Sequence, residues 1–382
     1  MNNTFLQSLK NVKWKHFVNY IAVGIVAIVF SLLTLTSGLP QSTLFLLEKI
    51  TMNIILAVSL SLVVGFLGEL SLGHAGFMCI GAYMGGKVAC LLDGAMDGDG
   101  IISFLIALVV GTVCAGVFGF VIGLPALRLK GDYLAIVTLA FGEIVKTVFE
   151  NSSEESFGGP IGLRTPRFDK HYLFIIGFIL VLITLFVIQN LIRSKHGRAI
   201  TAIRDNEIAA RATGINVTKY KLIGFIISSA FAGVAGVFYS FANSTVSASV
   251  FDYNFSIEIL IMVVLGGMGN ISGAIISATV ITYINTQLQT VLTGDLAVLK
   301  DIIYALILVI IIIYNNAPAL KTVREKYNLK AIISRFAAKA HHTGEDDARW
   351  DVVPTKIDMN EILSVDVKVV ESTMKPDKED QA

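Results

Sequence analysis

Long apolar stretches follow one another along most of this 382-residue chain, and they restrict its fold more than any other feature. A helix needs about 20 mainly apolar residues to cross a bilayer, where it must satisfy its own backbone hydrogen bonds. The sequence predicts spanning helices at residues 17–38, 50–68, 70–92, 101–124, 133–149, 172–192, 222–241, 255–268, 271–292 and 302–314. We therefore expect an all-α, polytopic membrane helix bundle of about ten transmembrane helices. The fifth, eighth and tenth segments are short, which leaves eight or nine helices as the alternative.

Composition excludes several other classes of protein. Hydrophobic residues make up 54% of the chain and charged residues 15%, and the mean hydropathy is +0.71, which leaves too little polar surface for a soluble globule of this length. The net charge is +1 and the basic residues lie in separate clusters, which argues against a nucleic-acid partner. Cys79, Cys90 and Cys114 lack the spacing of a metal site or a disulfide framework, so we expect them to pack in the core.

Basic residues are divided unevenly between the predicted connections. If the N-terminus is cytoplasmic, the inward segments hold 17 lysines and arginines and the outward segments hold five, as the positive-inside rule expects. Both termini are then cytoplasmic. The chain divides into a cytoplasmic N-terminal segment (1–16), a transmembrane domain (17–314) and a cytoplasmic C-terminal tail (315–382) that we expect to be partly disordered. The basic start of the tail, 321–342, has a helical spacing suited to anionic membrane lipid.

One predicted cytoplasmic connection, RSKHGRAITAIRDNEIAARATGINVTKYK at 193–221, is far longer than the roughly eight residues usual between bundle helices. Its alanines and closing glycine predict a short, narrow helix that enters a groove on a partner, with a stabilising pair of Glu207 and Arg211 at i,i+4. An ordinary solvated loop is the alternative. The candidate docking residues are Arg204, Asp205, Glu207, Ala209, Ala210, Arg211 and Gly214.

The stretch GELSLGHAGFMCIGAYMGGKVA, residues 68–89, combines six glycines with ionisable and hydroxyl side chains at membrane depth. Broken helix inside a membrane persists only where it is buried or lines a cavity, so this stretch is a candidate part of a translocation path. Close helix packing is the alternative for the glycines, and a buried, hydrogen-bonded histidine is the alternative to a proton relay through His74. The candidate path residues here are Glu69, Ser71, Gly73, His74, Gly76 and Tyr83.

Three further stretches carry candidate residues. Glu143 and Lys146 lie three apart in the fifth predicted helix and so share a face, either as a pair near the outer interface or as part of the path. In VLGGMGNISGA, residues 264–274, the glycines permit either a re-entrant break or tight packing. The path candidates in that stretch are Gly266, Gly267 and Gly269. In FGGPIGL, residues 157–163, proline and glycine predict a rigid outward turn suited to an external partner.

Residues 81–87 spell G-x-x-x-x-G-K, the start of a phosphate-binding P-loop, but the context is wrong for one. Val88 stands where a Ser or Thr hydroxyl must hold magnesium, no strand precedes the motif, and the stretch is hydrophobic. We therefore expect this chain to bind no cofactor and no metal. ATP and magnesium, if used, are expected on partner subunits.

Taken together, these stretches resemble a known family. The pattern Ala209-Ala210-x-x-x-Gly214 resembles the coupling loop of ABC-transporter permeases, and GRAITAIRDNEIAARATGINVTKYK looks like the version in branched-chain amino acid permeases of the LivM type. The likeness extends to GELSLGHAGFMCIGAYMGG, GDYLAIVTLAFGEIVK, FGGPIGL and VLGGMGNISGA, in the order of that family, and covers roughly residues 50–314. Ile208 departs from the general loop, where many permeases have glutamate, and the later proline of the general loop is absent.

The resemblance implies a multi-pass transport subunit of the bacterial inner membrane that is not itself an enzyme. Its implied partners are a second homologous permease subunit, two cytoplasmic ATPase subunits and a periplasmic substrate-binding protein that delivers leucine, isoleucine or valine. Two alternatives stay open: a urea or short-amide permease of the same superfamily, and a proton-coupled secondary transporter that uses Glu69, His74 and Glu143. A membrane enzyme is disfavoured because the sequence offers no metal ligands or nucleophile–base pair at usable spacing.

Overall fold

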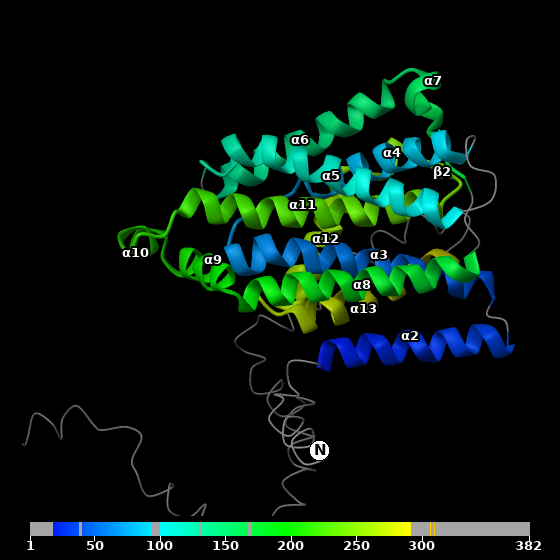
Figure 1. Ribbon diagram of the computed structural model, residues 1–382, viewed down its shortest axis with the longest axis horizontal. Helices are drawn as coiled ribbons and strands as arrows, with labels where there is room; N and C mark the ends of the chain where they lie inside the picture. The colour runs from blue at the N-terminus through cyan, green and yellow to red at the C-terminus, as the bar shows by residue number, and fades with distance from the viewer. Residues whose placement is uncertain are drawn as a thin grey trace, which may run out of the picture. The chain divides into compact units, whose positions relative to one another are not determined.

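The computed structural model describes residues 18–37, 40–93, 100–129, 131–166 and 170–291, with residues 306 and 309, all within one compact unit, Met1–Asn315. These residues are almost entirely helical (Figure 1), which confirms the predicted all-α class. The long helices are α2 (Val18–Ser37), α3 (Gln41–Ser61), α4 (His74–Asp93), α5 (Gly100–Ala126), α6 (Asp132–Glu150), α8 (Lys170–Arg193), α11 (Val217–Ala242), α12 (Tyr253–Gly266) and α13 (Ile271–Val291). The short elements are the π-helix η2 (Leu62–Leu67), α7 (Glu154–Phe157), η3 (Gly159–Ile161), strand β1 (Leu163–Arg164), α9 (Lys195–Asp205), α10 (Glu207–Ala212), strand β2 (Thr245–Val246) and η4 (Ala248–Val250).

The helices follow the predicted apolar segments closely. The tenth predicted segment, 302–314, lies outside the described residues apart from 306 and 309, so the structure does not test the expected count of ten. In the part of the chain that is described, six helices are long and apolar enough to cross a membrane: α3 with η2, α4, α5, α8, α11 and α13. Helices α2, α6 and α12 occupy the first, fifth and eighth predicted segments. The chain is therefore a multi-pass membrane protein.

Helix α3 forms the centre of the bundle. In the most apolar stretch of α3 and η2, 94% of the residues are buried. Helices α8, α11, α12 and α13 all pack against α3. Helix α11 also packs along α4 and α5 (Figure 1). Cys79 is buried in the core, and Cys90 and Cys114 pack against it, which confirms their expected packing role.

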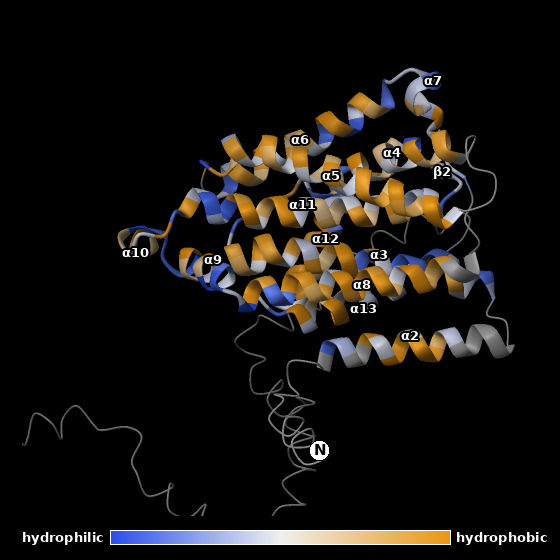
Figure 2. Ribbon diagram, in the orientation of Figure 1, coloured by the Kyte–Doolittle hydropathy of each residue, from blue (hydrophilic) through white to orange (hydrophobic). Residues whose placement is uncertain are grey.

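The outer helices present apolar side chains outward. Figure 2 shows hydrophobic residues along the long helices, including α5. On α5, Val109, Val113, Val117 and Val121 recur every four residues and are 53–63% exposed. Such a stripe is unfavourable in water and favourable in hydrocarbon, so it marks a surface that faces lipid.

The glycines of α4 pack instead of breaking the helix, which corrects the expectation that they interrupt the third segment. Helix α4 runs without interruption from His74 to Asp93. A methyl group on Gly81 would collide with the backbone of Gly233 on α11, and one on Gly76 would lie 2.7 Å from the Cα of Gly142 on α6. Glycine is thus required for these close crossings, and the real break is confined to residues 68–73.

Helix α3 begins nine residues earlier than predicted, at Gln41 instead of residue 50. Pro40 occupies the N-cap position with a φ of −61°, a backbone geometry that leads directly into a helix. The predicted segments, 17–38 and 50–68, leave Glu48 and Lys49 in the outward connection between them. Both residues instead lie within α3.

The two ends of the bundle differ in character. Helices α9 and α10 lie at the end of the bundle where α11 begins, here termed the loop end. At the opposite end of α11, the far end, β1 and β2 form an antiparallel pair in which Leu163 is opposite Val246. The turn before β1 uses Gly158 and Gly162 at φ values of 81° and 89°, which only glycine adopts readily, so the predicted rigid turn at residues 157–163 is confirmed.

Candidate functional site

The loop between α8 and α11 contains two helices where the sequence predicted one. Ser194 caps α9 by accepting hydrogen bonds from the amides of His196 and Gly197 at 3.1 and 3.3 Å. Asn206 has an extended backbone, which ends α9. Its side chain caps α10 by accepting a hydrogen bond from the Ala209 amide at 3.0 Å. Serine and asparagine are favoured N-caps because their side-chain oxygens satisfy amides that lack a helical partner. The extended backbone of Asn206 therefore separates the two short helices.

Helix α10 ends in a glycine turn. The Gly214 amide donates to the Arg211 carbonyl at 3.0 Å and the Ile215 amide donates to the Ala210 carbonyl at 3.1 Å, the pair of bonds that defines a Schellman motif. The φ of Gly214 is +85°, and nothing lies within 4 Å of a methyl group placed on it. Gly214 thus contributes a conformation that an alanine or larger residue would strain.

Two alanines of α10, Ala209 and Ala210, differ in exposure. This difference corrects the prediction that the alanines together enter a groove on a partner. Ala210 is 4% exposed and packs against Ile203 and Val217, so it holds the loop together from within. Ala209 is exposed, and Ile208 is 80% exposed. The outward surface of α10 is therefore centred on Ile208, the residue at which this loop departs from the general permease pattern.

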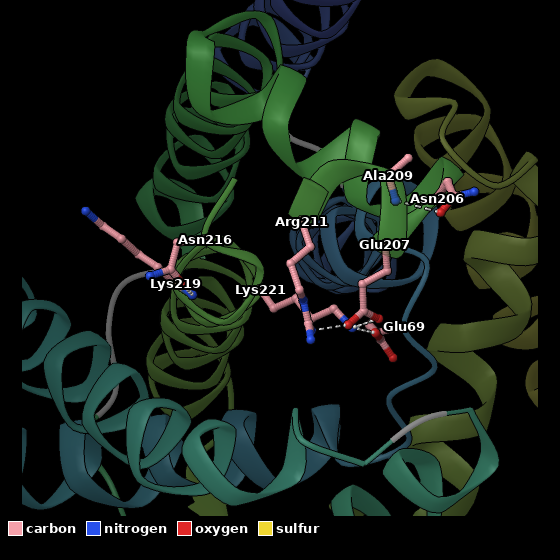
Figure 3. Close-up of polar contacts among 8 residues, drawn as sticks. All are labelled: Glu69, Asn206, Glu207, Ala209, Arg211, Asn216, Lys219 and Lys221. Atoms are coloured by element: carbon pink, nitrogen blue, oxygen red, sulfur yellow. Dashed lines mark hydrogen bonds and ion pairs between the residues drawn. The ribbon is translucent and has the colours of Figure 1, made fainter. Parts of the chain in front are cut away.

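A cluster of charged side chains ties the loop to the membrane helices (Figure 3). The Nζ of Lys221, in the second turn of α11, lies 2.5 Å from the Glu69 carboxylate and 3.2 Å from the Glu207 carboxylate. Glu207 also pairs with Arg211 at 2.9 Å, which confirms the predicted i,i+4 contact. Lys221 and Glu69 are only 4% and 9% exposed, so their charges are stable there because they are paired. Glu69, predicted for the translocation path, thus joins the loop cluster.

Arg204 makes a second link between the loop and the membrane helices. Its Nη1 donates to the Gly65 carbonyl in η2 at 2.9 Å, and its Nε and Nη2 donate to Asp205 at 3.1 and 3.0 Å. Because η2 ends at Leu67, the Gly65 carbonyl is one of the last carbonyls of that helix and needs a donor from outside it. A cation is also favoured at a helix C-terminus by the helix dipole.

The turn between α12 and α13 packs against the same part of the bundle, beside Gly65 and Arg204. A methyl group on Gly65 would collide with the backbone of Gly269, and the Nη1 of Arg204 lies 3.4 Å from a methyl group placed on Gly269. Gly267 and Gly269 have φ values of 91° and 80°, and Gly266 packs on the backbone of Gly273. Tight packing therefore explains Gly266, and the positive φ of the turn explains Gly267 and Gly269. The turn lies against Gly65 and Arg204.

The interrupted stretch 68–73 is mostly buried or half-buried, apart from the exposed Gly68, and neighbouring side chains accept hydrogen bonds from the backbone there. The Leu72 amide donates to Thr138 Oγ1 on α6 at 3.0 Å, and the Ala75 amide donates to Ser256 Oγ on α12 at 3.1 Å. Gly73 lies directly against the Thr138 carbonyl, and Ser71 is 2% exposed. Irregular backbone at membrane depth requires such partners. The stretch and the first turn of α4 thus connect the charged cluster of Glu69, Lys221 and Glu207 to α6 and α12.

His74 follows this stretch and is 2% exposed, with its Nε2 2.9 Å from Ser59 Oγ on α3. The Ser59 carbonyl in turn accepts a hydrogen bond from Ser228 of α11 at 2.6 Å. The structure therefore agrees with the alternative of a buried, hydrogen-bonded histidine that links the start of α4 to the core.

The remaining path candidates lie towards the far end. Tyr83 is fully buried, stacks on the Phe149 ring at 4.3 Å between centroids, and donates its hydroxyl to the Val246 carbonyl of β2 at 3.0 Å. Glu143 pairs with Lys146 at 3.7 Å, which confirms that the two share a face, and it accepts a hydrogen bond from the Tyr253 amide at 2.9 Å. The predicted path residues thus occupy separate places along the bundle.

Comparison with known proteins identifies the family. The profile of a family described as the permease component of branched-chain amino acid transport systems matches residues 42–312. The chain belongs to this family. The high-affinity branched-chain amino acid permease protein LivM of Escherichia coli K12 is 37% identical over 268 residues, 62% of this chain and 61% of the relative. The probable LivM protein of Methanocaldococcus jannaschii is 30% identical over 254 residues, 57% of this chain and 73% of the relative.

More distant similarity extends to sugar permeases. The ribose import permease protein RbsC of Escherichia coli K12 is 24% identical over 292 residues, 71% of this chain and 84% of the relative. No solved structure matches the chain. This permease spans about 61% of the length of Escherichia coli LivM, and the relatives are transport components, not enzymes.

Several residues that organise the site in this permease were absent from the sequence predictions. Lys221 had been counted only as a basic loop residue, although it is the cation at the centre of the charged cluster. Asn206 and Asn216 carried a readable signal, because asparagine directly before a helical run predicts an N-cap. Thr138 and Ser256 carried none, since a hydroxyl on a long apolar helix does not reveal which distant amide it accepts from.

Residues 81–87 lie inside continuous helix α4, which agrees with the rejection of a P-loop there. Among the described residues, no group of three or more His, Cys, Asp or Glu side chains is placed to hold a metal ion.

Proposed function

We propose that this chain is the membrane permease of an ATP-driven importer that carries leucine, isoleucine or valine across the inner membrane. The match to branched-chain permeases over residues 42–312 supports the cargo class. The excess of basic residues in the predicted inward segments supports a cytoplasmic loop end, with both termini on the same side. The observation that carries the transmission role is the double link from the loop to η2 and residues 68–73, through Arg204 and Lys221.

The links suggest how movement passes into the bundle. ATP and magnesium bind to two partner ATPase subunits, whose closure displaces α9 and α10. Because Lys221 holds Glu69 and Arg204 holds the Gly65 carbonyl, this displacement moves the end of η2 and the stretch 68–73 with the loop. That stretch contacts Thr138 of α6 through the Leu72 amide and leads into α4, whose Ala75 amide donates to Ser256 of α12. Both α6 and α12 therefore shift relative to α3. The change is an exchange between two packed arrangements of the bundle.

Two surfaces suit the other partners. A shallow hollow is lined by the half-buried Glu143 and the exposed Ile144, Thr147 and Val148 of α6, with the exposed Asn151 that caps this helix. Polar groups directed at lipid are costly, so we assign this face to a second, homologous permease subunit. The turn at residues 157–163, held by the β1–β2 pair, is assigned to the external substrate-binding protein.

The proposal is tested by reconstituting this chain in liposomes with the second permease, the ATPase subunits and the binding protein of its transport system. We expect ATP hydrolysis and uptake to be stimulated by the binding protein loaded with leucine, isoleucine or valine. Stimulation by urea alone would identify a short-amide permease instead. ATP hydrolysis by this chain without ATPase subunits would contradict the proposal that only the partner subunits hydrolyse ATP.

A proton-coupled mechanism finds less support. The three groups that a proton relay would use are held in separate contacts: Glu69 with Lys221, His74 with Ser59, and Glu143 with Lys146 and the Tyr253 amide. Uptake that survives removal of the ATPase subunits and collapses with the proton gradient would restore that alternative.

A further inference from the structure

A cavity of about 340 Å³ lies at the far end of the bundle, where five helices converge. Its lining includes Glu48 of α3, Met78 of α4, Phe238 of α11, Glu258 of α12 and Asn285 of α13. Helices α11, α12 and α13 pack against α3, and α4 packs against α11 and α12. The cavity therefore opens beside the most buried of the candidate membrane spans among the described residues. Its volume falls at the lower end of the roughly 300–1,000 Å³ typical of small-molecule sites, which suits a ligand of amino-acid size.

The polar part of the lining carries both signs of charge. Glu48 is 2% exposed, although it is a carboxylate in the second turn of a membrane helix. Glu258 is held by the Asn285 amide, whose Nδ2 donates to Glu258 Oε1 at 2.9 Å. Lys49 also lines the cavity, with its Nζ 5.1 Å from the centroid of the Phe45 ring. Ionisable groups inside a membrane protein are costly and therefore usually mark a functional site.

The rest of the lining is apolar. Met52, Met78, Phe238 and Phe255 contribute to the wall, and Met78 and Phe238 are fully buried. Methionine adapts its shape to different apolar partners, so such a wall accepts branched aliphatic groups of different outline. A lining with carboxylates, an ammonium group, amides and an apolar wall matches a zwitterion that carries an aliphatic side chain.

We propose that this cavity receives the transported amino acid after the binding protein releases it. The carboxylates of Glu48 and Glu258 accept hydrogen bonds from the α-ammonium group, and Lys49 with the neighbouring amides binds the α-carboxylate. The apolar wall holds the side chain. This inference rests on the proposed function and adds the site at which cargo enters. Helix α3 with η2 then carries the cargo cavity near its start and the Gly65 contact to the loop near its end.

The first experiment measures uptake by the reconstituted complex at saturating, leucine-loaded binding protein. We expect Glu48→Gln and Asn285→Ala each to lower leucine uptake about tenfold, the effect of losing about 1.4 kcal/mol of binding to a charged group. Glu155→Gln is the matched control, because Glu155 is an exposed carboxylate of α7 and does not line the cavity. Full uptake in both cavity variants, with leucine transport intact in the natural chain, would overturn this inference alone. Absence of leucine transport in the natural chain would overturn the proposed function.

The second experiment tests occupancy directly and does not depend on transport. Gln289 lines the cavity and is exposed, so Gln289→Cys, in a chain with Cys90 and Cys114 replaced by alanine, provides a site for a small maleimide. We expect L-leucine to slow the labelling at least about fivefold. Isoamylamine and 4-methylpentanoate, which each lack one of the two charged groups, should protect far less. Equal labelling with and without L-leucine, or no labelling at all, would contradict an outward-opening zwitterion site.

Discussion

The ammonium group of Lys221 lies 2.5 Å from the carboxylate of Glu69, although 152 residues separate them in the chain. The contact joins α11 directly to the stretch between η2 and α4, with Glu207 of α10 as a third partner. Both residues of the central pair are at least nine-tenths buried. Loss of one partner leaves a buried charge without compensation, which usually costs more than the intact pair contributes.

We therefore expect Lys221→Met to destabilise the protein by about 3 kcal/mol, the lower end of the range for truncating a buried ion pair. Lys219→Met is the control, because Lys219 is exposed and points away from the cluster in Figure 3. The measurement is thermal unfolding of the purified protein in detergent. The double variant Lys221→Met with Glu69→Gln should regain part of the loss, since the unpaired charge is removed. Equal melting temperatures for the Lys221 and Lys219 variants would show that the cluster is not stabilising.

Arg204 should be intolerant even of lysine. Its guanidinium donates to the Gly65 carbonyl and to Asp205 at the same time, and a single ammonium group cannot reproduce that fork. We expect Arg204→Lys to lower coupled leucine uptake about tenfold, because a hydrogen bond from a charged group contributes about 1.5–3 kcal/mol. Arg198→Lys is the matched control on the same helix, with an exposed side chain. Similar uptake rates for the two variants would show that the Arg204 contact does not pass movement of the loop to η2.

Ile208 should be the main apolar contact of α10 with an ATPase subunit. It is 80% exposed at the outward surface of the loop, and burial of an isoleucine side chain contributes about 1.5–3 kcal/mol. Ile208→Ser should weaken association with the ATPase subunits about ten- to a hundredfold. Ile161→Ser is the control, since Ile161 is 65% exposed at the far end. The measurement is pull-down of the ATPase subunits from membranes; undiminished recovery with Ile208→Ser would place the docking contact elsewhere.

Gly81→Ala should destabilise the bundle without touching a charged group. The added methyl group collides with the backbone of Gly233, and overpacking of a tight crossing typically costs about 1–3 kcal/mol. Gly24→Ala is the control, because nothing lies within 4 Å of a methyl group at that helical position. Thermal unfolding in detergent compares the two variants. An unchanged melting temperature for Gly81→Ala would show that α4 and α11 separate easily at this crossing.

Helix α3 is longer than its predicted segment because hydropathy alone does not show that charged residues continue a helix. A window of apolar residues located the spanning part from residue 50, but Glu48 and Lys49 looked like a polar connection. In the structure they remain helical, because Pro40 starts the helix nine residues earlier and the neighbouring helices surround them. Glu48 and Lys49 were therefore missed for one reason: a charged side chain inside a helix end has the same local pattern as one in a loop.

The loop between α8 and α11 shows the same limit at shorter range. Its length, its charge pair at Glu207 and Arg211, and its glycine terminator were all readable from local spacing, and the structure confirms the pair. The division at Asn206 and the inward orientation of Ala210 were not predicted. The inward face of α10 depends on Ile203 and Val217, which belong to the helices before and after it.

The sequence by itself determined the membrane class, the positions of most helices, the family and the long loop, because each of these is written in local hydropathy, spacing and motif order. Only the tertiary structure decided which polar groups meet. Glu69 was assigned to a path and Lys221 to a loop, yet they form one pair, because α11 packs beside η2 and brings them together. Contacts between residues 152 positions apart depend on how whole helices pack, and no local pattern in the chain records that arrangement.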